Sequence, residues 1–121
     1  MIEVDTTAGR VRGRVEGPVS VFRGIPFAAP PVGPRRFAAP EPPVPWDVLD
    51  AATFGPVPPQ SAQGPVPPAP TVLDDPRGWL TANVWSPDTA GRRPVMVWIY
   101  GGAYRAGSSA EPSYDLSLIH I

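Results

Sequence analysis

Apolar and polar residues alternate at the amino end of the chain. Ile2 and Val4 alternate with acidic residues, and residues 10–16 alternate a charged residue with valine or glycine. A period of two is typical of a strand with one covered face and one solvated face. The runs are separated by turn residues, so the sequence predicts a small antiparallel meander. Its three predicted strands cover residues 2–5, 10–16 and 19–23.

The arginines of the second strand, Arg10, Arg12 and Arg14, all fall on its polar face. The acidic residues Glu3 and Asp5 lie on the neighbouring strand, close enough to balance them. This arrangement favours an ion-paired, solvated strand face over an anion-binding site.

Two later runs predict further strands. Residues 79–85 alternate again, whereas residues 95–100 are continuously apolar and end at Gly101-Gly102. A short apolar run that includes valine and isoleucine predicts a strand covered on both faces, as in an α/β sheet. Ligands bind outside the carboxyl ends of such strands, where exposed N–H groups can hold a developing oxyanion. The alternative is that the two glycines only make a tight turn.

Proline dominates the middle of the chain, with 15 of the 20 prolines between Pro26 and Pro70. The first part, residues 24–46, carries the aromatic residues Phe27, Phe37 and Trp46, which predict a loop anchored to an apolar surface. The second part, residues 54–70, has no aromatic residue after Phe54 and predicts a mobile surface loop. Its alternative is a polyproline segment, residues 56–70, that binds an SH3-like partner.

Composition excludes several classes of function. A net charge of −1 gives no electrostatic footprint for nucleic acid or an anionic membrane. The absence of cysteine excludes disulfides and thiolate metal sites, so we expect no metal and no cofactor. No apolar run is long enough to span a membrane, and residues 1–10 do not resemble a secretory signal. These features predict a cytoplasmic protein.

The last six residues, LSLIHI, differ in composition from the rest of the chain. They contain the single histidine, His120, and resemble a translated sequencing adapter. We therefore expect the natural sequence to continue past Asp115, residues 116–121 to be a non-native tail, and His120 to have no catalytic role.

Several segments together resemble the amino-terminal part of a type B carboxylesterase, a member of the α/β-hydrolase family that also contains the cholinesterases. The most specific is FRGIPFAAPPVGPRRF at residues 22–37, which follows the pattern F-x-G-I-P-[YF]-A-x-P-P-V-G-x-x-R-F. The strand segment LTANVWSP begins at Leu80, and PVMVWIYGGAYRAGSS begins at Pro94. The resemblance implies an α/β fold class and an incomplete esterase domain over residues 1–115.

The resemblance also implies a site and a substrate. The N–H groups of Gly102 and Ala103 would be the oxyanion donors, with Gly101 shaping the turn, and the substrate would be a small-molecule ester. Tyr104 and Trp98 are expected to be packing residues, although Tyr104 could line the acyl pocket.

The chain departs from the family pattern before Leu80. Arg77 occupies the position of an acidic residue that would pair with the arginine matching Arg36, and Trp79 replaces a cysteine. Two arginines cannot pair, so either Asp74 or Asp75 substitutes, or residues 74–79 align with the family pattern in a different register.

A catalytic triad is missing, because the chain contains no G-x-S-x-G elbow and no histidine outside the tail. We therefore expect the 121-residue chain to be inactive, with serine-dependent ester hydrolysis belonging to the full-length parent. Two alternatives remain: a non-catalytic esterase-like scaffold, and the proline-rich interaction module.

Overall fold

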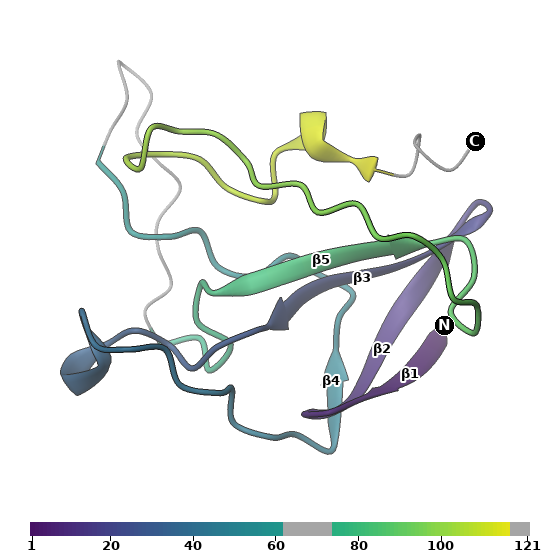
Figure 1. The fold of residues 1–121 in the computed structure, drawn as a ribbon, viewed down its shortest axis with the longest axis horizontal. Helices are drawn as coiled ribbons and strands as arrows, with labels where there is room; N and C mark the ends of the chain where they lie inside the picture. The colour runs from purple at the N-terminus through teal and green to yellow at the C-terminus, as the bar shows by residue number, and fades with distance from the viewer. Residues whose placement is uncertain (62–73, 117–121) are drawn as a thin grey trace.

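The computed structural model describes residues 1–61 and 74–116, which build a mostly antiparallel sheet (Figure 1). In these residues the strands are β1 Ile2–Thr6, β2 Gly9–Glu16, β3 Val19–Pro26, β4 Val48–Asp50 and β5 Thr81–Ser86. Two short 3-10 turns, η1 Gly33–Arg35 and η2 Pro112–Tyr114, complete the regular elements of the described part. The amino-terminal meander predicted from the alternation is confirmed.

Strand β2 is paired along its whole length, but with different neighbours. Its first half pairs with β1, from Gly9 opposite Thr6 to Gly13 opposite Ile2, while its last three residues pair with β3. Because β3 separates from β2 after these pairs, β4 lies parallel to β2 and fills the opened edge. The alternation pattern did not predict β4, which is only three residues long.

Strand β3 extends to Pro26, three residues beyond its predicted end at Arg23. Strand β5 holds this extension, pairing with β3 from Ser20 opposite Ser86 to Pro26 opposite Thr81, with an irregularity between Phe22 and Ile25. The strand predicted at residues 79–85 is thus confirmed as β5.

The core lies between the meander and β4. Val11, Phe22 and Ala51 form its buried centre. Partly buried apolar residues pack around them: Ile2, Val4, Ile25, Trp46 and Leu49. Val11 and Gly13 are buried on one face of β2, which explains the period of two there, whereas Val15 on the same face is 58% exposed.

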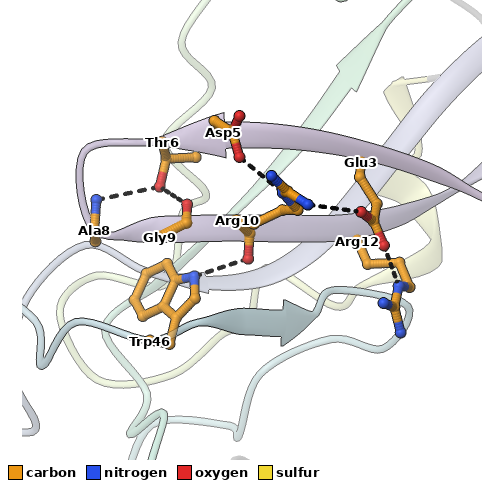
Figure 2. Close-up of polar contacts among 8 residues, drawn as sticks. All are labelled: Glu3, Asp5, Thr6, Ala8, Gly9, Arg10, Arg12 and Trp46. Carbon is orange, nitrogen blue, oxygen red and sulfur yellow. Dashed lines mark hydrogen bonds and ion pairs between the residues drawn. The ribbon is translucent and has the colours of Figure 1, made fainter.

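The polar face of the β1–β2 hairpin is ion-paired, as its sequence indicated (Figure 2). Arg10 Nε lies 2.8 Å from an Asp5 oxygen, and Arg12 Nε lies 2.7 Å from a Glu3 oxygen. The Trp46 indole N–H donates to the Arg10 carbonyl at 3.0 Å. Trp46 therefore anchors its loop, as predicted.

The other two predicted anchors are wrong. Phe27 is 61% exposed and Phe37 is 94% exposed, because no described element covers this part of the proline-rich loop. The Arg36 guanidinium lies 5.0 Å from the centre of the Phe37 ring. Asp75 pairs with Arg77 at 2.9 Å, so its partner is the neighbouring arginine and not Arg36.

The predicted strand at residues 95–100 is also wrong for this chain. These residues form no strand, and Val95, Val97 and Ile99 are 77–86% exposed. A strand exists only when neighbours satisfy its backbone groups and cover its faces. The described residues provide no such neighbours, so the apolar run remains outside the sheet.

A bidentate ion pair joins the end of β2 to β3 and makes stability depend on pH. Arg23 donates to both Glu16 carboxylate oxygens, at 2.6 and 2.8 Å. These hydrogen bonds hold the pKa of Glu16 below its ordinary value of 4.5. A lowered pKa in the folded state means that the stabilisation is complete above the unfolded value and is lost as pH falls.

We therefore expect the thermal midpoint of the 121-residue chain to fall as pH drops below about 4.5. Glu16→Gln should lower the midpoint at pH 7 and make its decline between pH 5 and 3 shallower, as followed by circular dichroism. Glu3 and Asp75, whose pKa values are also lowered by arginine, should preserve part of the slope in that variant. Equal slopes for Glu16→Gln and the unmodified chain would contradict this account.

Candidate active site

The chain turns sharply after residue 100 through a left-handed backbone. Gly102, Ala103 and Tyr104 have φ values of 138°, 52° and 60°. The amides of Arg105 and Ala106 both donate to the Gly102 carbonyl, at 2.9 and 3.1 Å. The turn is closed by these later amides, and among the described residues no protein acceptor bonds the N–H of Gly102 or of Ala103.

Glycine is required at one point of this turn. A Cβ at Gly102 would lie 1.8 Å from the Ala106 carbonyl oxygen, a distance that no rearrangement of side chains can relieve. A Cβ at Gly101, in contrast, would meet no atom within 4 Å. Gly102 is therefore the residue of the pair that excludes a side chain, and the turn-shaping role expected of Gly101 stays a prediction.

The two residues that follow are strained. A left-handed φ at a residue with a side chain costs on the order of 1 kcal/mol. The left-handed conformation of Ala103 and Tyr104 therefore persists only because contacts elsewhere in the chain stabilise it. Strain of this kind often occurs at functional sites, where it fixes the direction of backbone groups.

Two side-chain amides bond the segment that follows the turn. Gln60 Nε2 donates to the Gly107 carbonyl at 3.1 Å, and the Gly107 N–H donates to Gln60 Oε1 at 3.0 Å. Asn83, in β5, donates through Nδ2 to the Ser109 carbonyl at 3.2 Å. Sequence reasoning missed both residues. The available signals were a glutamine directly after two prolines and the single asparagine of the chain inside a predicted strand.

The turn borders an open cleft of about 520 Å³. The cleft is lined by all three residues predicted for the site: Gly101, Gly102 and Ala103. The proline-rich segment contributes Pro58, Pro59 and Gln60 to its lining. This volume is in the range of small-molecule sites. Arg105 is the charged residue among those lining the cleft, and its positive charge favours a developing anion.

The aromatic residues near the cleft divide into two kinds. Tyr104 lines the cleft and is fully exposed, so it is not a packing residue in this chain, and the alternative that it lines the acyl pocket stays a prediction. The rings of Trp98 and Tyr100 lie 5.8 and 6.4 Å from the ring of Tyr114, centre to centre. These two residues make packing contacts with η2, although Trp98 remains 57% exposed.

Residues 1–61 and 74–116 contain neither a metal-binding cluster nor a membrane-spanning helix. No group of three acidic or histidine residues there is arranged to hold a metal ion. No helix in this part of the chain is long and apolar enough to cross a membrane. Residues 62–70 of the proline-rich module lie outside the described residues.

Comparison with known proteins identifies the family. The model of the carboxylesterase family matches residues 1–120. The chain belongs to this family. The resemblance seen in the sequence motifs is confirmed.

Two curated relatives match the chain with similar sequence identity. Para-nitrobenzyl esterase of Bacillus subtilis is 45% identical over 114 residues, covering 93% of the chain and 23% of the relative. Phenmedipham hydrolase of Pseudarthrobacter oxydans is 44% identical, covering 90% of the chain and 23% of the relative. The chain thus spans about a quarter of the length of the curated relatives that it matches.

Solved structures agree with the fold class. The carboxylesterase of Geobacillus stearothermophilus matches with a TM-score of 0.81 and 44% identity, covering 95% of the chain and 22% of that structure. A para-nitrobenzyl esterase structure matches with a TM-score of 0.79 and 45% identity, over 97% of the chain and 24% of that structure. The structural neighbours are α/β-hydrolase esterases, so the predicted fold class is confirmed.

Proposed function

We propose that the complete protein, meaning this chain together with the remainder of a carboxylesterase domain, hydrolyses carboxylic esters through a serine acyl-enzyme. Family membership supports the reaction class. The observation that carries the proposal for this chain is the left-handed turn, whose Gly102 and Ala103 amides have no protein acceptor in the described residues and border a cleft.

The chain's own residues supply electrostatic stabilisation. When a serine oxygen attacks the ester carbonyl, negative charge develops on the carbonyl oxygen. The Gly102 and Ala103 N–H groups donate to that oxygen, and Arg105 adds positive charge at the cleft. Because the turn is already formed, these donors need no reorganisation during the reaction. Water then hydrolyses the acyl-enzyme and releases the acid.

The substrate in this proposal is a small-molecule ester, and no metal, cofactor or nucleic acid takes part. A cytoplasmic location is part of the same proposal. It is supported by the absence of cysteine from all 121 residues, which suits a reducing compartment.

The activity of the two forms of the protein tests the proposal. The 121-residue chain has the proposed donors but no G-x-S-x-G elbow, so p-nitrophenyl acetate should produce no acylation burst with it. The complete protein, obtained by reading the contiguous gene, should give a stoichiometric burst followed by steady turnover. Stopped-flow release of p-nitrophenol measures both.

Either of two results would count against it. A burst from the 121-residue chain would show that its nucleophile had been overlooked. A complete protein that folds but lacks a serine, histidine and acid in the remainder, and releases no p-nitrophenol, would instead be an esterase-like scaffold.

A further inference from the structure

We propose that Gln60 and Asn83 are positioning residues that hold the oxyanion turn in its left-handed conformation from outside the turn. This inference rests on the proposed function, because it assigns a role to the Gly102 and Ala103 amides. Neither carboxamide takes part in the proposed chemistry itself. Each acts on the segment through which the chain returns from the turn.

Gln60 binds the backbone of Gly107 as a neighbouring strand would. Its side chain donates to the Gly107 carbonyl at 3.1 Å and accepts from the Gly107 N–H at 3.0 Å. The same Nε2 donates to the Pro58 carbonyl at 3.2 Å, which fixes the side chain to its own segment. A carboxamide carries one acceptor and one donor group, so it matches a peptide unit in both directions.

The proline-rich sequence explains why a side chain performs this task. Pro58 and Pro59 have no N–H, so this segment cannot form an ordinary ladder with the turn. Gln60 supplies the donor that the prolines lack. Gln60 follows Pro58 and Pro59 in the wall of the cleft, and its side chain connects the proline-rich segment to Gly107.

Gly107 is the point where this restraint is effective. It has a φ of 107°, and a Cβ there would lie 2.6 Å from the Gly101 carbonyl oxygen. The chain after the turn therefore lies directly against the chain before it. Fixing Gly107 fixes the distance between the two ends of the turn, which contains the strained Ala103 and Tyr104.

Asn83 connects the same return segment to the sheet. Its Nδ2 donates to the Ser109 carbonyl at 3.2 Å, while its Oδ1 accepts from the Gly24 N–H at 2.9 Å. Gly24 lies in the irregular part of β3, so one carboxamide joins β3, β5 and the return segment. The turn is thereby held at Gly107 by the proline-rich segment and at Ser109 by the sheet.

Amide hydrogen exchange in the 121-residue chain tests the restraint directly. In Gln60→Ala the Gly107 amide should exchange at least about 10-fold faster, because its acceptor is removed. Asn83→Ala should similarly accelerate exchange at Gly24, whose amide loses the Oδ1 acceptor. Ser61→Ala is the matched control, since Ser61 is exposed and adjacent to Gln60, and it should change neither amide. Val21, which is fully buried in β3, reports whether each variant retains the sheet.

A second variant separates restraint from folding. Gln60→Glu keeps an acceptor for the Gly107 N–H and removes the donor to its carbonyl, so Gly107 exchange should lie between the unmodified chain and Gln60→Ala. If Gln60→Ala loses protection at Val21 as well, Gln60→Glu provides the decisive measurement. Unchanged Gly107 exchange in a Gln60 variant that retains Val21 protection overturns the proposal.

Kinetics of the complete protein test the consequence for the turn. Gln60→Ala should lower kcat by about 10²-fold with KM changed less than about 3-fold, because displaced donors weaken only transition-state binding. A trifluoromethyl ketone, whose tetrahedral hemiketal with the serine carries the oxyanion, should lose affinity in parallel with kcat. Equal loss of affinity for substrate and ketone would assign Gln60 to substrate contact and overturn the positioning role.

The two proposals fail in different measurements. If the complete protein releases no p-nitrophenol from an activated ester, the esterase proposal fails and the exchange data still decide whether Gln60 restrains the return segment at Gly107. If turnover is normal in Gln60→Ala and Asn83→Ala, the esterase proposal stands and the positioning role is overturned.

Discussion

Gly102→Ala should reduce kcat for ester hydrolysis by the complete protein by at least about 10³-fold. The added Cβ would lie 1.8 Å from the Ala106 carbonyl oxygen, and the φ of 138° is rarely adopted by a residue with a side chain. The backbone must therefore change, and both proposed donors change direction with it. Loss of one oxyanion donor costs on the order of 10²–10³ in turnover, and this substitution displaces two. Steady-state hydrolysis of p-nitrophenyl acetate measures the loss.

Two neighbouring substitutions serve as comparisons for Gly102→Ala. A Cβ at Gly101 meets no atom within 4 Å, so Gly101→Ala should cost less than about 10-fold. Ala103→Gly keeps the N–H and relieves a residue at φ 52°, so the protein should be active and no less stable. If all three substitutions reduce kcat equally, the turn is not the origin of the effect.

Val97→Lys should have opposite effects in the short chain and in the complete protein. In the 121-residue chain Val97 is 77% exposed and lies outside any strand, so lysine should not reduce the protection of the sheet amides. It should also reduce self-association, because residues 95–99 form an exposed apolar strip of five residues, each at least 57% exposed. In the complete protein, where we expect this strip to be a central strand, burial of the charge should cost more than about 4 kcal/mol.

Analytical ultracentrifugation of the short chain and chemical unfolding of the complete protein provide the two measurements. Val97→Ile, which keeps a β-branched apolar side chain, should behave as the unmodified protein in both. A complete protein that tolerates Val97→Lys would show that the strip remains at the surface there too, and would refute the central-strand assignment.

The sequence predicted the meander because its signal is local. Alternation over residues 10–16 depends on one buried face, and β1 and β2 are joined by a short turn. Pairing between neighbouring strands needs little loop closure, so the pattern and the observed register agree. Motif resemblance identified the family for a different reason, since fixed residues in residues 22–37 require no knowledge of the fold.

The apolar run at residues 95–100 shows why local pattern is insufficient. Its apolar residues indicate what would stabilise a strand, but a strand forms only when another segment pairs with it. In the described residues this partner is missing, and Val97 is solvent-exposed. Phe27 and Phe37 show the same limit of local pattern. Their apolar side chains predicted burial, but no described segment covers them.

The sequence alone determined the meander, the arginine-bearing face and the position of Gly101-Gly102, because each depends on residues near one another in the chain. Tertiary structure decided how the turn is held. Gln60 lies 47 positions from Gly107, and Asn83 lies 26 positions from Ser109. Contacts at such separations arise only when the sheet and the proline-rich segment bring distant carboxamides to the same backbone, and no periodicity along the chain records them.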